Sequence, residues 1–431
     1  MSGLLDFFLN RTPILYLTQS LWRDEAFSVA MSRGTVLEII SRAINDFNPP
    51  LYYLTLHFWM KVFGSSEISL RIPSFIFFSI LIYVVYKFAK KLFPTSNFPL
   101  LTSILAATNP ILLYFAFEVR MYSWLALFST LSMYYFYQKK WQLWLLFTAL
   151  GLYTQPYMAF IVLAQASYLF LTRQLRKNYR RFFYLFLLYL PWLPVIVSQF
   201  SRSGPMWIWP INWTTVQTIL GNLYTGYEGT PGNFWWLATI LSAVIVILSV
   251  LTISGKKPKT MLLFLLWVFL PVVLTLIVSY FKPIYVNRYL IFVSVAEIFL
   301  ITGGILSLKN YFLRIILTFL FLLFNFSFNL WFAPYHKKVD IRQTIAEINL
   351  LAAPSDLIIA KTPLVFFETE YYSPNPSQVF LYNPQNIPVP HYVGDVAIPK
   401  GKMIRAFPNY PKRAFLVFED GHYEVVYNFI K

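Results

Sequence analysis

The sequence contains no cysteine, and only 12% of its 431 residues are charged. Without cysteine, disulfide bonds and thiolate metal sites are excluded. A typical soluble domain carries about twice this fraction of charged residues. Hydrophobic residues make up 58% of the chain and aromatic residues 20%. The composition therefore favours a membrane protein over two or three soluble domains.

Acidic residues are scarce in the central part of the chain. Between residues 71 and 333 there are only three, Glu118, Glu228 and Glu297, although the whole chain has a formal charge of +17. A basic balance can indicate nucleic-acid binding, but these basic residues gather in every second loop between apolar runs. This is the pattern of a membrane protein whose basic loops face the cytoplasm, so we predict no nucleic-acid partner.

Apolar runs long enough to cross a bilayer fill the central part of the chain, and they predict a bundle of about ten or eleven transmembrane helices. The expected spans lie near residues 71–91, 99–117, 121–138, 141–155, 156–172, 181–200, 234–253, 261–281, 289–308 and 311–333. Pro156 predicts a break between two of them. The apolar stretch 4–17 is too short for an ordinary span, and we interpret it as a truncated first span or as the result of a misplaced start.

The loops between the spans predict the topology. One set is basic and has no acidic residue, so we expect it on the cytoplasmic side. This set contains Lys87, Lys90, Lys91, Lys139, Lys140, Arg173, Arg176, Lys177, Arg180, Arg181, Lys256, Lys257, Lys259, Lys309 and Arg314. The other side has residues 1–70, the turn around Glu118, the loop 201–233, the turn 282–288 and everything after 333. We therefore expect a multi-pass protein of the plasma or inner membrane.

The composition changes after residue 333, where charged and polar residues return. We predict a membrane domain over 1–333, with a first external loop over 18–70, and a small external α/β domain over 334–431. Asp340 is placed to cap a helix with apolar residues at helical spacing up to Leu351. Strands are expected at 356–360, 378–382, 414–418 and 423–429, and Asp420-Gly421 predicts a closing hairpin turn.

Several charged residues of the external side are candidates for chemistry. Asp24 and Glu25 are adjacent, and such a pair suits a general base or a metal site; alternatively it is a solvated pair beside Arg23. Glu118 and Arg120 lie in a short loop between spans, where charges usually face a cavity or a partner, unless they form a mutual ion pair. His57 is a candidate third ligand of a divalent metal, although a single histidine is weak evidence.

Two cations and one deep carboxylate complete the candidates. Arg288 begins a span and Lys282 ends the one before it, a level that suits a phosphate group, although an interfacial arginine also binds lipid headgroups. Glu297 lies in the middle of a span, about two turns below Arg288. An intramembrane carboxylate is either functional or a protonated structural partner of a neighbouring helix.

Taken together, five stretches resemble the membrane glycosyltransferases of the C-type fold. More narrowly, they are similar to the protein-mannosyltransferase-like group that includes bacterial lipid A aminoarabinose transferases. The stretches are WRDEAFS (22–28), DFNPPLYYLTLHFW (46–59), FGSSEISLRIPS (63–74), FEVRMYSW (117–124) and NRYLIF (287–292). They cover roughly the first 300 residues, in order and in register with the expected spans.

The resemblance implies a transferase that takes a sugar from a polyprenyl phosphate and binds its acceptor, a lipid, glycan or protein, on the external side. Asp24 then acts near the acceptor hydroxyl, and Glu118 shares the site. We also assign substrate binding to Arg120, Arg288, Lys282, Tyr52, Tyr53 and Arg71. Metal ligation varies in this family, so a divalent metal held by Glu25, Glu118 and His57 stays open, and no other cofactor is expected.

The residues fit this interpretation. No nucleotide-activated sugar is readily available outside the cytoplasm, so a lipid-linked donor suits an external site. One base and a direct displacement would invert the anomeric centre without a carboxylate nucleophile, by analogy with inverting glycosidases. Two alternatives remain: a transporter or lipid flippase, for which polar residues inside the spans are expected, and a non-catalytic envelope assembly protein.

Overall fold

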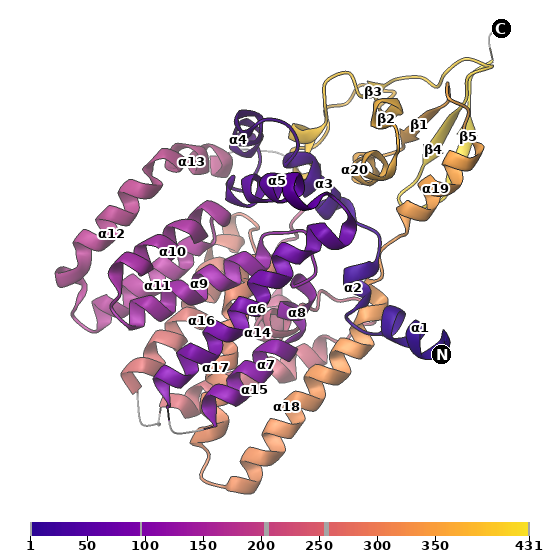
Figure 1. The fold of residues 1–431 in the computed structure, drawn as a ribbon. Helices are drawn as coiled ribbons and strands as arrows, with labels where there is room; N and C mark the ends of the chain where they lie inside the picture. Colours follow the sequence, from indigo (N-terminus) through magenta and orange to yellow (C-terminus); the bar gives the residue numbers. More distant parts are fainter. Residues whose placement is uncertain (1, 95–96, 202–206, 254–257, 430–431) are drawn as a thin grey trace. The chain divides into compact units, whose positions relative to one another are not determined.

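The computed structural model describes the whole chain apart from residues 1, 95–96, 202–206, 254–257 and 430–431 (Figure 1). It contains two compact units. The first consists of Met1–Leu15, Arg71–Phe200 and Ile208–Tyr335. The second consists of Tyr16–Leu70, Ser201–Trp207 and His336–Lys431.

The first unit is built from helices that follow the expected spans. They are α6 (Glu67–Leu92), α7 (Phe98–Thr108), α8 (Pro110–Phe115), α9 (Tyr122–Tyr137), α10 (Trp141–Thr154), α11 (Met158–Leu171), α12 (Leu175–Tyr189), α13 (Leu193–Ser201), α15 (Trp235–Ile253), α16 (Pro258–Phe281), α17 (Ile291–Ser307) and α18 (Tyr311–Phe332). The other helical elements are α1 (Ser2–Arg11), α2 (Leu15–Thr18), α14 (Trp213–Thr225), and the 3₁₀ helices η1 (Leu190–Trp192), η2 (Asn287–Leu290) and η3 (Ala333–His336).

Six helical segments in the described part of the chain are long and apolar enough to cross a membrane. Other apolar helices are shorter, and proline explains two of the breaks. The expected break at Pro156 is confirmed, since α10 ends at Thr154 and α11 begins at Met158. The expected span 99–117 is two helices, because Pro110 cannot donate a hydrogen bond to the preceding turn. Asn109 caps the second of them, accepting a hydrogen bond from the Leu112 N–H at 3.1 Å.

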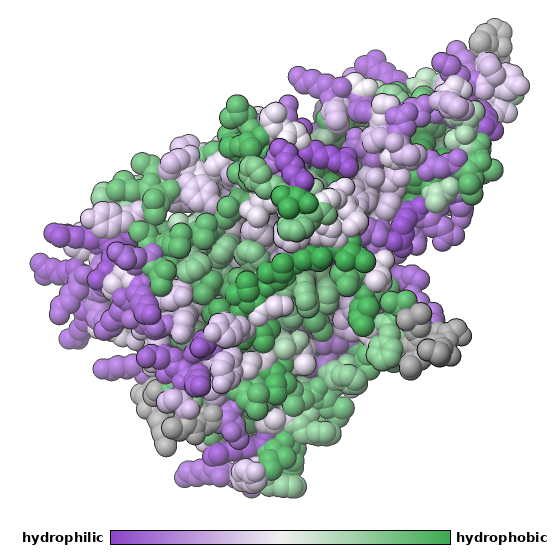
Figure 2. Space-filling view, viewed as in Figure 1, coloured by the Kyte–Doolittle hydropathy of each residue, from purple (hydrophilic) through white to green (hydrophobic). Residues whose placement is uncertain are grey.

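Helix α17 is the most buried of the spanning segments, with 89% of its apolar window inside the protein. It contacts α7, α9, α15, α16 and α18. Phe299 of α17 packs its ring 4.8 Å from that of Phe264 and 5.3 Å from that of Phe88. The outer helices instead present apolar side chains to their surroundings, and the hydrophilic side chains gather around the loop from α11 to α12 (Figure 2). The predicted mostly helical membrane fold is confirmed.

The second unit combines the first loop with the C-terminal region. The loop forms α3 (Arg23–Met31), α4 (Val36–Asn45) and α5 (Leu51–Phe63). The C-terminal region forms α19 (Ile341–Leu351), α20 (Pro363–Tyr372), the 3₁₀ helices η4 (Pro376–Gln378), η5 (His391–Val393) and η6 (Asp395–Ala397), and strands β1 (Leu357–Ala360), β2 (Val379–Tyr382), β3 (Met403–Ile404), β4 (Ala414–Val417) and β5 (Tyr423–Val426). The five strands lie in the order β3-β2-β1-β4-β5.

The predicted C-terminal α/β fold is confirmed. Asp340 caps α19 by accepting a hydrogen bond from the Gln343 N–H at 3.2 Å. Strands β4 and β5 pair antiparallel through the predicted turn, where Gly421 has a φ of +87°. The other neighbouring strands are parallel. Helix α20 and the short strand β3 were not predicted, and α20 is the element that matters for the site.

Helix α20 packs against α3 of the first loop. The rings of Phe27 and Phe367 lie 5.4 Å apart in an edge-on contact. Gly394 closes over this pair, because a Cβ there would meet the Phe27 ring at 2.6 Å. The Leu21 N–H donates a hydrogen bond to the Tyr372 hydroxyl at 2.6 Å. The sequence divided the chain at 333, whereas these contacts join the first loop and the C-terminal region in one compact unit.

Candidate active site

The acidic pair of the first loop lies in the first turn of α3. Glu25 is completely buried, and its Oε2 accepts hydrogen bonds from the Trp22 N–H at 3.2 Å and from Lys338 Nζ at 3.3 Å. The Lys338 ammonium also lies 4.7 Å from the centroid of the Trp22 ring. A carboxylate in the first turn complements the helix dipole. Glu25 therefore fixes the start of α3, and Asp24 sits beside it, partly exposed.

A second buried carboxylate, Glu368 of α20, lies near the start of α3. Burial raises its pKa to about 8. The positive charges of Arg23 and Lys338 oppose this rise in pKa, and the negative charge of Glu25 adds to it. At neutral pH Glu368 is therefore mostly protonated. Sequence reasoning missed it, because no local pattern connects it with residues far earlier in the chain.

Asp46 is another buried carboxylate that sequence reasoning missed, although it opens one of the stretches that carry the resemblance. Its Oδ2 accepts hydrogen bonds from the Tyr53 hydroxyl at 3.1 Å and from the Asn48 backbone N–H at 3.3 Å. These bonds fix the turn between α4 and α5. Tyr52 and Tyr53, predicted to bind substrate, are both buried. Tyr53 is thus engaged in holding Asp46.

Of the predicted metal ligands, Glu25 and His57 belong to the second unit and Glu118 to the first. No group of three or more histidine, aspartate or glutamate side chains converges in the described part of the chain. His57 is buried, and its Nδ1 lies 2.9 Å from the Ser32 carbonyl oxygen. The Glu25 carboxylate is held by an ammonium and a backbone N–H. The Glu25 carboxylate is therefore already engaged, whereas Nε2 of the buried His57 has no hydrogen-bond partner among the described residues.

In the first unit, Glu118 and Arg120 lie in the tight loop between α8 and α9, and both are buried. Ser74 of α6 fixes this loop, since its hydroxyl lies 2.7 Å from the Glu118 carbonyl oxygen and 3.3 Å from that of Arg120. At the end of the loop, the Ser123 hydroxyl donates to the Phe115 carbonyl at 2.8 Å. The predicted charges are thus held on a rigid backbone.

The structure brings Arg120 and Arg288 together around one aromatic ring. The guanidinium carbons of Arg120 and Arg288 lie 5.8 and 6.0 Å from the centroid of the Tyr122 ring. Each guanidinium is thus within the distance, about 6 Å, at which a cation binds an aromatic face. The two cations are therefore within about 12 Å of each other. Tyr122 is buried, and its hydroxyl has no hydrogen-bond partner among the described residues. The sequence singled out both arginines but not the tyrosine between them.

The segment that presents Arg288 is anchored on both sides. The Asn287 side chain donates to the Tyr227 carbonyl at 3.0 Å, and Tyr285 donates to the Asn287 side chain. Tyr157 of the α10–α11 turn donates to the Ile284 carbonyl. A guanidinium presented from a fixed backbone loses little freedom when it binds an anion.

Three further candidates lie elsewhere in the first unit. Lys282 donates a hydrogen bond to the Phe200 carbonyl and lies 4.5 Å from the Phe200 ring, so it ties α16 to α13. Arg71 is completely buried in α6. Glu297 is buried in α17, and its carboxylate oxygens have no hydrogen-bond partner among the described residues.

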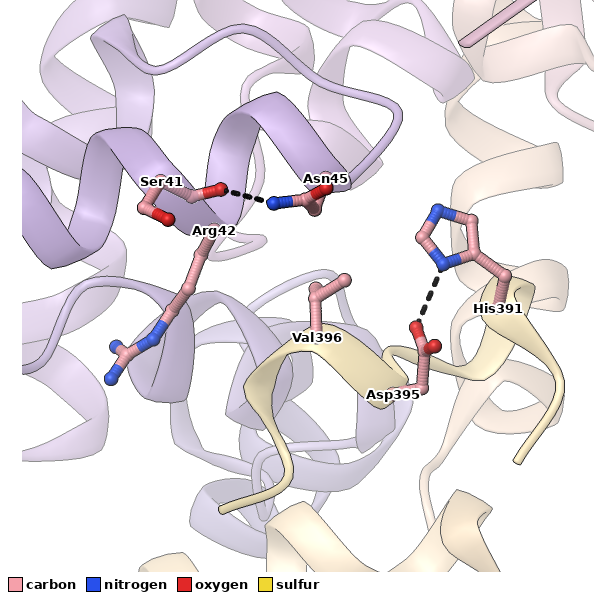
Figure 3. A pocket seen from close by; sticks show the side chains of 6 residues that line it. All are labelled: Ser41, Arg42, Asn45, His391, Asp395 and Val396. Atoms are coloured by element: carbon pink, nitrogen blue, oxygen red, sulfur yellow. Dashed lines mark hydrogen bonds and ion pairs between the residues drawn. The ribbon is translucent and has the colours of Figure 1, made fainter. Parts of the chain in front are cut away.

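The second unit also has an open polar groove of about 530 Å³ between α4 and η5–η6 (Figure 3). Ser41, Arg42 and Asn45 line one side, and His391 and Asp395 the other. His391 Nδ1 pairs with the Asp395 carboxylate at 2.8 Å. The groove offers both hydrogen-bond donors and acceptors to a polar molecule.

The chain is similar to one protein-family model and to solved structures of one protein. Residues 48–198 match the family model of dolichyl-phosphate-mannose-protein mannosyltransferases. The fold is similar to the crystal structure of ArnT from Cupriavidus metallidurans in the apo state, with a TM-score of 0.63, 10% identity, and coverage of 97% of this chain and 91% of ArnT. ArnT bound to undecaprenyl phosphate gives a TM-score of 0.59 at the same identity and coverage. The chain has the C-type membrane glycosyltransferase fold.

The predicted C-type membrane glycosyltransferase fold is thereby confirmed. The family match covers about a third of the chain and includes Glu118, Arg120 and Tyr122. It begins after Asp24 and ends before Arg288. A comparison with curated protein sequences gives no significant match. The C-type fold extends the likeness over nearly the full length of both chains.

Proposed function

We propose that this protein transfers a sugar from a polyprenyl-phosphate donor to an acceptor hydroxyl on the external side of the membrane, with inversion. The observation that carries the proposal is the pair of arginines beside the Tyr122 ring, of which Arg120 is buried and Arg288 partly buried. The departing group of such a reaction is a lipid phosphate, whose charge grows as the bond to the sugar breaks. Cations placed in advance and shielded from water stabilise that charge most effectively.

We assign Asp24 as the general base. It lies in the first turn of α3, which Glu25 and Lys338 hold in place. In the reaction, Asp24 takes the proton of the acceptor hydroxyl as that oxygen bonds to the anomeric carbon. The bond from this carbon to the phosphate oxygen breaks, and the polyprenyl phosphate leaves with the electron pair. One base suffices, because no covalent sugar-enzyme intermediate forms.

Glu25 then has a positioning role, since both hydrogen bonds described for its Oε2 hold the start of α3. We keep Glu118 as a candidate partner of the acceptor. The undecaprenyl phosphate in one of the ArnT structures supports a polyprenyl phosphate as the donor lipid. The acceptor is a hydroxyl-bearing lipid, glycan or protein, and the polar groove of Figure 3 supports an acceptor-orienting role for the C-terminal region.

The test is single-turnover transfer by the purified protein from a radiolabelled polyprenyl-phosphate sugar. Asp24→Asn is nearly isosteric but cannot take the proton, so the transfer rate should fall about a hundredfold or more while donor binding is unchanged. Asp420→Asn changes an exposed carboxylate of the same unit and should transfer normally. Near-normal transfer by Asp24→Asn would remove the base assignment.

The donor site is tested separately. Arg288→Lys keeps the charge but loses the planar pair of donors, and Arg288→Ala loses both. Donor affinity should fall in that order, with the fold intact. A protein that moves the labelled lipid across the membrane of a vesicle, but forms no new glycosidic bond with any acceptor, would support the flippase alternative instead.

A further inference from the structure

A large groove lies in the first unit, where α7, α15, α16 and α18 surround the C-terminal half of α17. Its volume is about 1010 Å³. Most of the side chains that line it are apolar, and Figure 2 shows apolar side chains along α18, on the side of the molecule where α7 and α15 lie in Figure 1. The lining residues on these four helices and on α17 include those at the helix ends next to the predicted basic loops. Lys91, Lys259 and Lys309 lie at or beside these ends.

The groove has the depth of one bilayer leaflet. Its contacts on α18 are Tyr311, Arg314, Ile315, Thr318, Phe319 and Leu322. These positions recur every three or four residues, so they form one face of the helix. From the first to the last they span about three turns, or roughly 16 Å. Half of the hydrocarbon thickness of a bilayer is about 15 Å. The groove therefore has the length of the acyl chains of one leaflet.

The polarity of the groove changes along this length. Arg314 lies near the basic-loop end, and its Nε donates to the Leu308 carbonyl at 2.5 Å, which fixes the guanidinium at that level. Asn97 and Ser307 lie at the same end of the bundle. Toward the middle of the bundle the lining continues with residues such as Phe319 and Leu322. None of the described residues that line the groove is acidic. A phosphate at Arg314 with hydrocarbon below it matches this arrangement.

We propose that this groove binds one anionic glycerophospholipid of the leaflet next to the basic loops, with its chains between α7 and α18 and its phosphate at Arg314. A soluble ligand does not suit these surroundings, because most of the lining belongs to α15, α16, α17 and α18, which are each long and apolar enough to cross a membrane. An anionic lipid is favoured over a neutral one because basic residues near a membrane surface attract negative headgroups.

This site is distinct from the proposed donor site. Arg288 precedes α17, whereas the groove contacts Gly303, Leu306 and Ser307 at its other end. A helix of 17 residues separates the two levels by about 25 Å. The proposal therefore does not depend on the transfer reaction, and it is tested without it.

The test uses full-length protein, stripped of lipid in a neutral detergent, and native mass spectrometry. Phosphatidylglycerol and phosphatidylcholine with identical chains compete for the protein. We expect phosphatidylglycerol to be retained preferentially, and Arg314→Gln to lower this preference about fivefold. Arg180→Gln removes an exposed arginine of α12, which the same charge pattern places on the same side, and should leave the preference unchanged. Thr318→Phe fills the groove and should reduce retention of both lipids.

Three results would overturn the proposal. The first is equal retention of the two lipids by the unchanged protein. The second is a preference that falls equally in Arg314→Gln and Arg180→Gln, because the effect would then belong to total charge. The third is displacement of phosphatidylglycerol by undecaprenyl phosphate in the unchanged protein but not in Arg314→Gln, which would assign the groove to the polyprenyl lipid.

Discussion

Replacing Lys338 by Met should loosen the start of α3, although Lys338 lies more than 300 residues after it. The Lys338 ammonium is 3.3 Å from Glu25 Oε2, and the two side chains are 10% and 0% exposed. Removing one partner of a buried ion pair leaves an uncompensated charge and typically costs about 3–5 kcal/mol. The contact of Lys338 with the Trp22 ring is lost as well, which adds roughly 0.5–2 kcal/mol.

The assay is thermal unfolding in detergent, together with transfer from the lipid-linked sugar. Lys338→Met should lower both the apparent Tm and the transfer rate. Lys337→Met removes an exposed neighbouring cation and should change neither. The double variant Lys338→Met, Glu25→Gln removes both charges, and Gln still accepts the Trp22 N–H. It should recover much of the stability, with a coupling energy of about 1–3 kcal/mol.

The reasoning fails if the double variant is no more stable than Lys338→Met, since the loss would then not come from the unpaired Glu25 charge. It also fails if Lys337→Met has the same effect. A double variant that recovers stability but not transfer would show that the Glu25 charge has a role in the reaction itself, beyond holding α3.

Three further predictions follow from the same structure. Tyr122→Phe should bind the donor normally and Tyr122→Leu several-fold more weakly, because only the second removes the ring beneath both arginines; equal loss in both variants would point to the hydroxyl. Glu368 has a pKa of about 8 in the folded protein, against an ordinary value of 4.5. Between these pH values the folded protein binds one more proton than the unfolded protein. Its free energy of unfolding therefore falls by up to about 1.4 kcal/mol per pH unit as pH rises. Glu368→Gln should therefore match the unchanged protein in Tm at pH 5 and exceed it at pH 8, and a constant difference would contradict the assignment. A reporter fused after Lys431 should score as external and one inserted at Lys177 as cytoplasmic; finding both on one side would refute the topology.

Local patterns in the sequence predicted most of the secondary structure of both regions, but not α20 or β3. Span positions follow from apolar runs, because a helix in lipid must satisfy its own backbone and cover it with apolar side chains. Asp340 predicted the start of a helix and Gly421 a hairpin turn, because helix caps and left-handed turns depend on adjacent residues. Helix α20 was missed because its residues, PLVFFETEYY, carry no clear apolar stripe.

The candidate site was only half determined in this way. The sequence singled out Asp24, Glu25, Arg120 and Arg288 as charges at one level of the membrane. It did not show that both arginines face Tyr122, or that Lys338 and Glu368 surround the start of α3. Most of those relations join residues more than 150 positions apart. Such contacts form by packing, which leaves no periodic pattern in the chain. The sequence by itself therefore determined which groups are available and predicted their level along the membrane. The tertiary structure decided which of them meet, because burial sets both the partners and the protonation of each charge.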